Sequence, residues 1–328
     1  MLGPAPPSTR SRAWDAATSL LPLAAGAALA IALSWVLPWV SPLMWGIVLG
    51  SVVANVAPDR DRRRTADAAR LALRLGIVGL GLQLSLSDVA AVGPRGLLVI
   101  ATTVVATWSL THAAGRRWGL EPRLVTLIAA GFSICGAAAI AAVQDAVRAR
   151  ERDVATALAL VTLFGTALVV AIPAATHALG LTAEQGAVWA GASIHEVGQV
   201  VAAATILGAA VVPTASVVKL GRVVLLAPAY ARAARTHRDP AGRSVALVPW
   251  FIVGFVVACL VRATGVLPAG TLDGARHTTT FLLAVGMFGL GLDLRLAHLA
   301  RIPVRAVGLA AFATAVAVTV SGVQVALL

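Results

Sequence analysis

Long apolar runs fill nearly the whole chain, and they limit its possible folds more than any other feature. They are continuous and about 20 residues long, which predicts membrane helices rather than the alternating strands of a transmembrane barrel. Only 12% of the 328 residues are charged, against about 25% in soluble proteins, so a water-soluble fold is excluded. The eleven runs are 18–37, 43–57, 71–87, 95–112, 122–147, 154–176, 184–206, 214–231, 246–263, 277–293 and 304–326.

Arginines in the gaps between the runs predict how the chain is oriented. Positively charged loops prefer the cytoplasm, and the basic clusters become cytoplasmic if the N-terminus is inside and the runs alternate. These clusters lie at 60–70, 116–123, 232–243 and 295–305. We expect residues 1–17 to form a disordered cytoplasmic tail and residues 18–328 to form a single transmembrane domain.

Two of the runs are predicted to break in the middle of the membrane. Arg148, Arg150 and Arg152 would lie outside the cell if 122–147 crossed the membrane once. The conflict disappears if 122–147 enters from the cytoplasm and returns, and 184–206 does the same from outside. Arms of about 12 residues would reach about 18 Å, the middle of the bilayer. The sequence does not distinguish such re-entrant hairpins from broken crossing helices.

Two internal similarities suggest repeats. Residues 79–86 (GLGLQLSL) recur as 289–296 (GLGLDLRL), and in this topology one copy runs outward and the other inward. Inverted repeats of this kind are typical of secondary transporters. Residues 131–136 (GFSICG) resemble 191–196 (GASIHE), and each stands at a predicted break. The offsets of 210 and 60 residues differ, so one duplication does not explain both similarities.

The Gly-x-Ser-Ile sequence at each break suits a helix that ends and starts again. Ser133 and Ser193 are expected to cap the restarted helices. The amide groups and the positive dipole end of each new helix would then attract a small anion near mid-membrane. The alternative is a pair of glycine kinks that only allow the helices to pack.

The most polar cluster inside any run is His195-Glu196-x-x-Gln199. His195 and Gln199 share a helix face, and intramembrane ionisable groups are usually functional, so His195 or Glu196 is a candidate proton-coupling site. Ser193 and Glu196 also have the spacing of a capping box, which gives the carboxylate a purely structural alternative. The cluster differs from the His-Glu-x-x-His zinc motif at one position, so an intramembrane zinc hydrolase is a further alternative.

Two cations in the run 214–231 complete the candidate site. Ser216, Lys219 and Arg222 are spaced by three residues and form a polar stripe, and Lys219 is the only lysine in the chain. We expect the two cations to bind an anionic substrate or a coupling group, because charges in a span avoid lipid. The alternatives are an ion pair with Glu196 or Asp145, and a lysine that snorkels to the membrane surface.

Four stretches resemble the YeiH-type sulfate exporter family of bacterial inner-membrane proteins. They are GFSICGAAAIAAV at 131–143, WAGASIHEVGQVVAA at 189–203, VKLGR at 218–222 and LGLQLSL at 80–86. The resemblance covers nearly the whole chain from about residue 43. It implies a multi-pass secondary transporter, related in fold to the cation/proton antiporters and bile-acid symporters. Phe132 and Gly198 depart from the family pattern, which has a small polar residue and Ala there.

The sequence therefore predicts an all-α polytopic membrane protein with about 11 segments, inverted repeats and two discontinuous helices. We expect it to carry a small anion, sulfate or a sulfonate, by alternating access with proton coupling, and an anion channel is the alternative. The predicted anion-binding residues are Ser133, Cys135, Gly136, Ser193, His195, Gln199, Lys219 and Arg222, with His195 and Glu196 as coupling residues. We expect no catalysis, cofactor, metal or nucleic-acid partner. The expected partners are the anion, the lipid bilayer and a second copy of the chain in a homodimer.

Overall fold

Every regular element in the part that the computed structural model describes is a helix, and that part is residues 9–37, 40–56, 62–84, 90, 93–236, 249–292 and 302–327. The helices are α1 (Thr9–Val36), α2 (Pro42–Val56), α3 (Arg62–Gly81), α5 (Gly93–Arg117), α6 (Pro122–Ser133), α7 (Ala137–Val147), α8 (Glu151–Ala178), α9 (Ala183–Ser193), α10 (Val197–Leu207), the 3₁₀ helix η1 (Ala209–Val211), α11 (Val212–Val224), α12 (Leu226–Thr236), α13 (Trp250–Ala263), α14 (Ala269–Leu292) and α16 (Val304–Ala326). The predicted all-α class is confirmed.

The predicted apolar runs are mainly helical where the structure describes them, but the number of membrane segments and the inverted repeats stay predictions. Half of the second copy of the GLGL repeat, residues 293–296, lies outside the described residues. Residues 1–8 of the predicted tail lie outside them as well, and α1 begins at Thr9.

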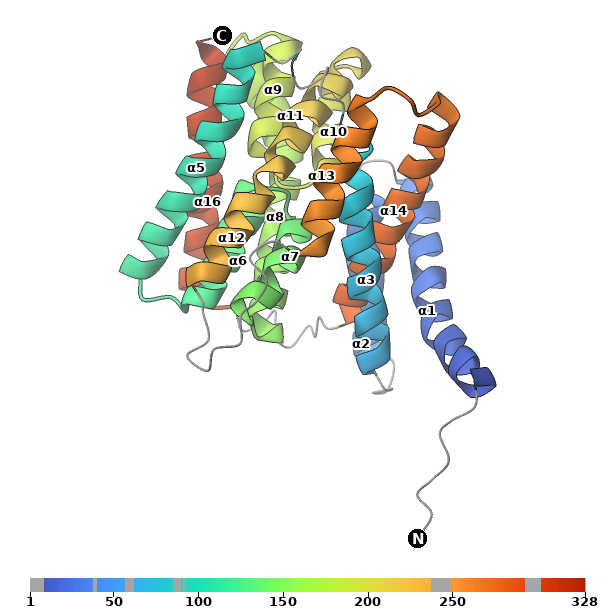
Figure 1. Cartoon of the computed structure of the whole chain (residues 1–328). Coiled ribbons are helices and arrows are strands. Elements are labelled where there is room, and N and C mark those ends of the chain that lie inside the picture. Colours follow the sequence, from blue (N-terminus) through green and yellow to red (C-terminus); the bar gives the residue numbers. More distant parts are fainter. Residues whose placement is uncertain are drawn as a thin grey trace.

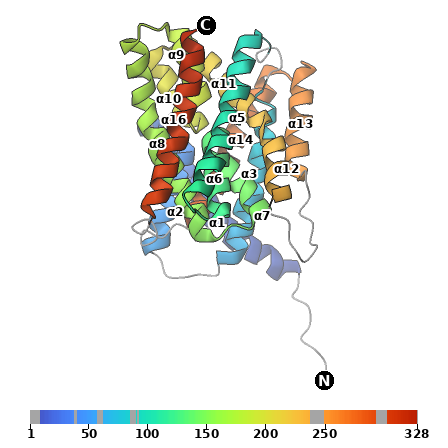
Figure 2. The same ribbon diagram turned by 90° about the vertical axis from the view of Figure 1, so that its left-hand side faces the viewer.

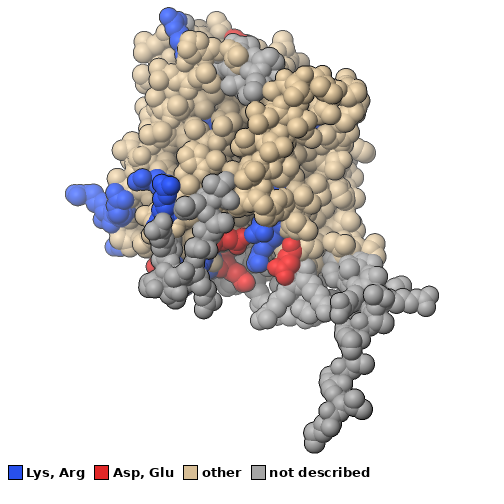
Figure 3. Space-filling model, viewed as in Figure 1, with Lys and Arg blue, Asp and Glu red and all other residues tan. Residues whose placement is uncertain are grey.

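The surface of the molecule suits a lipid environment. Four stretches are long and apolar enough to cross a membrane: α5, α8, α16 and the continuous segment Ala209–Thr236 that holds η1, α11 and α12. Large apolar side chains such as Leu163 and Val170 on α8 are 63% and 67% exposed. Figure 3 shows that Lys, Arg, Asp and Glu gather mainly toward one end of the visible face and are almost missing from its middle. Such a belt is what the hydrocarbon region of a bilayer requires.

The helices pack as two groups. We call α1, α2, α3, α13 and α14 the panel bundle, and α5 to α12 with α16 the hairpin bundle; Figure 1 shows the panel bundle on the right. Within the panel bundle, α14 packs closely against both α2 and α3. The principal helix pair that joins the two bundles is α3 with α7.

Both predicted breaks exist, and both broken segments are hairpins. Arg123 at the start of α6 donates a hydrogen bond from its guanidinium group to the carbonyl oxygen of Arg148, just after α7, at 3.1 Å. A Cβ atom placed on Gly186, near the start of α9, would lie 2.9 Å from Cδ1 of Leu207, the last residue of α10. The two ends of each segment therefore lie side by side, which supports the re-entrant interpretation over crossing helices.

The two hairpins enter from opposite ends of the molecule. Figures 1 and 2 agree in placing α9 and α10 at the upper end and α6 and α7 toward the lower end. Each arm is 11 or 12 residues long. At 1.5 Å per residue, such an arm spans about 17 Å and stops near the middle of a bilayer.

Glycines allow α2 and α14 to approach closely, and this contact can be tested. A Cβ atom on Gly291 would collide with the carbonyl oxygen of Ile47 in α2. We expect Gly291→Ala to lower the free energy of unfolding by about 1–3 kcal/mol, because the helices must move apart. The measurement is the apparent melting temperature of the detergent-purified protein. Gly270→Ala in the same helix is the control, since its Cβ would meet no atom within 4 Å; equal melting temperatures for the two variants would contradict this packing.

Candidate functional site

The tips of the two hairpins touch inside the hairpin bundle. A Cβ atom on Gly136, at the tip between α6 and α7, would lie 2.6 Å from Cγ of Glu196 and 3.1 Å from the carbonyl oxygen of His195. Glu196 and His195 stand at the tip between α9 and α10. Gly136 also has a φ of 71°, which favours glycine. Close contact and backbone conformation therefore both require glycine at this position.

Ser133 and Ser193 end the first arm of each hairpin instead of capping the second. Their hydroxyl groups donate hydrogen bonds one turn back, to the carbonyl oxygens of Ala129 at 2.6 Å and Trp189 at 2.7 Å. The predicted serine caps are wrong, because three residues of turn separate each serine from the restarted helix. A helical serine hydroxyl can be satisfied within its own helix in this way.

Gly136 and Glu196 are the actual N-caps of α7 and α10. The prediction of a capping box between Ser193 and Glu196 is therefore wrong, because Glu196 is the N-cap residue and not the third residue of the helix. The box lies three residues further on, where the Gln199 side chain accepts a hydrogen bond from the backbone N–H of Glu196 at 3.1 Å. No described side chain donates a hydrogen bond to the Glu196 carboxylate.

Lys219 on α11 bridges the two tips. Its Nζ donates hydrogen bonds to the carbonyl oxygens of Ile134 at 2.7 Å and Ile194 at 2.8 Å, which are equivalent positions in the two hairpins. The residue is 0% exposed, so the snorkelling alternative is wrong. The ammonium group instead satisfies carbonyl groups that the end of a helix leaves without an intrahelical donor.

Arg222, one turn further along α11, also donates hydrogen bonds to carbonyl groups at the helix ends. It is 0% exposed, and its guanidinium group donates to carbonyl oxygens at the ends of α6 and α9. The acceptors are Phe132 at 2.9 Å, Ser133 at 3.1 Å, Gly191 at 3.3 Å, Ala192 at 2.7 Å and Ile194 at 3.1 Å. These ends carry the negative pole of the helix dipole, so both cations sit where their charge is favoured.

The predicted ion pairs of the two cations are wrong. Within the described part of the chain, neither Lys219 nor Arg222 forms a salt bridge with a carboxylate. Asp145, one of the proposed partners, instead pairs with Arg74 at 2.6 Å. The backbone carbonyl groups of the hairpins take the place that a carboxylate would otherwise occupy.

His195 and Glu196 are the buried ionisable groups on the second tip. His195 is 0% exposed, its Nε2 lies 3.3 Å from the hydroxyl of Thr314 on α16, and its ring centroid lies 4.4 Å from that of Phe132. Its Nδ1 has no hydrogen-bond partner in the described part of the structure. Phe132 therefore packs against the candidate coupling residue. Thr314 carries no sequence signal, because nothing distinguishes it from the other threonines of the apolar runs.

The Gln199 side chain connects the second tip with α8. Its Nε2 lies 3.4 Å both from the carbonyl oxygen of Thr162 and from the hydroxyl of Thr166, and the side chain packs against Gly165. Its amide thus orients the start of α10. Cys135 is buried with a free thiol at the first tip, close to the remaining predicted residues.

Gly198, the second departure from the family pattern, faces the panel bundle. A Cβ atom on Gly198 would collide with the side chain of Ser41, just before α2. The small residue therefore allows α10 to approach the panel bundle where an alanine would force the two apart.

Positive charge exceeds negative charge where the tips meet. Lys219 and Arg222 are two basic groups, and the positive poles of α7 and α10 are matched by the negative poles of α6 and α9. Glu196, 1% exposed, is the one carboxylate that the described structure buries beside them. Among the described residues, no group of three or more His, Cys, Asp and Glu side chains could hold a metal ion.

Buried helices, apolar faces and mid-membrane hairpins together define a polytopic helical membrane protein. The family model described as "Conserved hypothetical protein 698" matches residues 18–310. The chain therefore belongs to this family, whose named relatives are UPF0324 membrane proteins, and the YeiH-type resemblance is confirmed.

Three of these relatives show how far the similarity extends. The UPF0324 membrane protein of Corynebacterium glutamicum is 42% identical over 243 residues, which are 73% of this chain and 70% of that protein. That of Agrobacterium fabrum is 38% identical over 231 residues, 69% of this chain and 66% of the relative. That of Pseudomonas aeruginosa is 37% identical over 256 residues, which are 74% of this chain and 72% of the relative. No solved structure matches this chain significantly.

The role of Arg222 in holding the tips gives a stability prediction. Arg222→Met removes the donor of several buried carbonyl groups, and each acceptor left unpaired costs about 1–3 kcal/mol. We expect a large fall in melting temperature or a loss of folded protein, with Arg222→Lys intermediate. Arg235→Met, at an exposed position on α12, is the matched control and should melt like the wild type. Equal stability of the Met variants at 222 and 235 would show that the carbonyl contacts do not hold the hairpins.

Proposed function

We propose that this protein is a secondary transporter of a small anion, sulfate or a sulfonate, in the bacterial inner membrane. The observation that carries the proposal is the surplus of buried positive charge at the hairpin tips. A protein interior does not tolerate uncompensated charge, so a site with two cations and one carboxylate favours an anion.

The proposed anion lies between the N-terminal ends of α7 and α10. Backbone N–H groups in the first turn of a helix bind anions well, and Gly136 leaves room for close approach of the backbone. Lys219 and Arg222 donate their hydrogen bonds to the carbonyl ends of α6 and α9. In this proposal they therefore supply positive potential and hold the tips, while the amide groups of the second arms contact the anion.

Glu196 is the proposed coupling residue. Its carboxylate lies against Gly136, at the place where an anion would approach α7. Protonation of Glu196 would remove a negative charge from this place, and a dianion would then balance the two positive charges of Lys219 and Arg222. His195, on the same tip, is the second candidate for a change of protonation. A proton would thus accompany each dianion through the transport cycle.

The division into two bundles supports alternating access. Lys219 and Arg222 connect both hairpin tips to α11, so the hairpins would move together as one unit. The contact of the hairpin bundle with the panel bundle is concentrated at α3 and α7. Movement of one bundle against the other would expose the tips first to one side of the membrane and then to the other. The proposed topology keeps the N-terminus in the cytoplasm, and a homodimer is compatible with it.

Anion binding can be tested before transport is measured. A ligand that binds only the folded protein stabilises it by about 2.7 kcal/mol at a concentration 100 times its Kd. We expect sulfate or a sulfonate to raise the melting temperature of the detergent-purified protein more than chloride at equal ionic strength does. A panel of oxyanions and sulfonates that leaves the melting temperature unchanged would contradict the proposed ligand class.

Proton coupling through Glu196 gives a separate transport prediction. In proteoliposomes we expect saturable sulfate uptake that is faster when unlabelled sulfate is inside and that rises as the pH falls, because Glu196 must be protonated. Glu196→Gln should remove most of this pH dependence, whereas Asp273→Asn at an exposed position should keep it. Uptake that is neither saturable nor accelerated by internal sulfate would indicate a channel. An unchanged pH profile in Glu196→Gln would exclude this residue as the coupling group.

A further inference from the structure

We propose that an ion pair between the two bundles, Arg74 of α3 with Asp145 of α7, is a gate that closes the route to the hairpin tips from one end of the molecule. The inference rests on the proposed transport function, because a gate has meaning only if the bundles move. Asp145 lies at the end of α7 that is remote from the tips. The observations behind the gate are therefore different from those that define the anion site.

The ion pair is the centre of a small cluster that spans both bundles. The guanidinium Nη2 of Arg74 lies 2.6 Å from Oδ2 of Asp145, and its Cζ lies 5.9 Å from the ring centroid of Phe251 on α13. Phe251 in turn packs edge-on against Tyr230 of α12, with 6.4 Å between the centroids. We call these four residues the clasp. Arg74 and Phe251 belong to the panel bundle, and Asp145 and Tyr230 belong to the hairpin bundle. The clasp therefore connects the two bundles.

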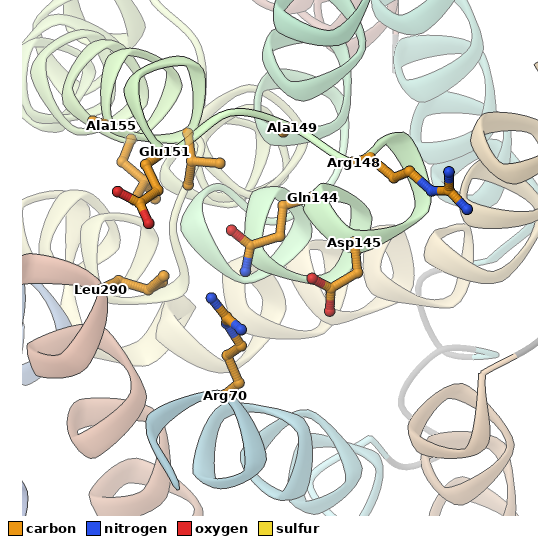
Figure 4. Close-up of a pocket in the computed structure, with 10 residues that line it drawn as sticks. Arg70, Gln144, Asp145, Arg148, Ala149, Glu151, Ala155 and Leu290 are labelled. Atoms are coloured by element: carbon orange, nitrogen blue, oxygen red, sulfur yellow. The ribbon is translucent and has the colours of Figure 1, made fainter. Parts of the chain in front are cut away.

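A cavity of about 210 Å³ lies directly beside the clasp, and its walls also come from both bundles. The panel bundle contributes Arg70 and Leu290, and the hairpin bundle contributes residues of α7 and α8 that include Gln144, Asp145 and Glu151. Figure 4 shows the Arg70 side chain pointing from α3 across the cavity toward Gln144, with Asp145 beside it. Separation of the bundles at this place would therefore widen the cavity and deepen it along α7 toward the tip.

The strength of the ion pair suits a contact that must open repeatedly. The side chains of Arg74 and Asp145 are 35% and 43% exposed. Ion pairs that are accessible to solvent contribute little net stability and are weakened by salt. The clasp can thus bias the position of the bundles without locking it. Its end of the molecule is also where the surface charges gather in Figure 3, as expected where the protein meets water.

Chemical labelling tests the gate without any assumption about the transported ion. Ala155, 4% exposed, lines the cavity on α8, and Ala155→Cys places a thiol there. We expect Asp145→Asn to raise the rate at which a membrane-impermeant maleimide labels this thiol several-fold. Exchange of the two charges, Arg74→Asp with Asp145→Arg, should return the rate to its original value. The natural Cys135 and Cys259 are buried, and the chain without Ala155→Cys gives their background.

The matched control is a carboxylate whose partner lies in the same bundle. Glu184 on α9 is exposed and accepts a hydrogen bond from Thr214 of α11 at 2.6 Å, so Glu184→Gln removes a similar charge without touching the contact between the bundles. It should leave the labelling rate of the thiol at position 155 unchanged. A rate that is the same in Asp145→Asn and in Glu184→Gln would overturn the gate.

Cross-linking gives a second test that does not depend on weakening the clasp. A short thiol cross-linker between Arg74→Cys and Asp145→Cys should stop sulfate counterflow. The same reagent between Thr102→Cys and Gln324→Cys should not, because these side chains, 2.9 Å apart, both belong to the hairpin bundle. Full counterflow with positions 74 and 145 joined would overturn the gate. If labelling behaves as expected but no variant or wild-type protein moves any anion, the gate stands and the proposed anion function fails.

Discussion

The structure depends on how the chain ends a helix in the middle of a membrane. The last turn of a helix leaves backbone carbonyl groups without donors, and in a hydrocarbon environment each such group costs several kcal/mol. Lys219 and Arg222 solve this problem for both hairpins at once, because each donates to carbonyl groups at the ends of both first arms. The cations are stable inside the protein for the same reason, since the carbonyl oxygens replace the water that they lose.

This arrangement separates the two poles of the hairpin helices. The negative ends of α6 and α9 are neutralised by α11, whereas the positive ends of α7 and α10 face each other near Gly136 and Glu196. In the proposed function, the backbone of these positive ends forms the anion site, and the charged side chains mainly set its potential. Because one helix holds both tips, the site can move as a unit relative to the panel bundle, as the proposed transport cycle requires.

Part of this could be predicted from the sequence. Apolar runs indicate membrane helices, and the Gly-x-Ser-Ile sequences mark the two breaks because glycine and serine weaken a helix locally. The direction of the second arms could not be predicted, since a hairpin and a crossing helix have the same composition. The serine caps were predicted wrongly because the length of the turn has no sequence signal. The partners of Lys219 and Arg222 were missed because backbone carbonyl groups are the same in every residue.

The central claim, that an anion binds between the restarted helices, is tested most directly by locating one. Selenate has the charge and shape of sulfate, and its selenium atom scatters X-rays anomalously. In crystals grown with selenate, we predict an anomalous peak between the N-terminal turns of α7 and α10, beside Glu196. A peak at another place with these turns empty, or continuous helices through Ser133 and Ser193, would contradict the account.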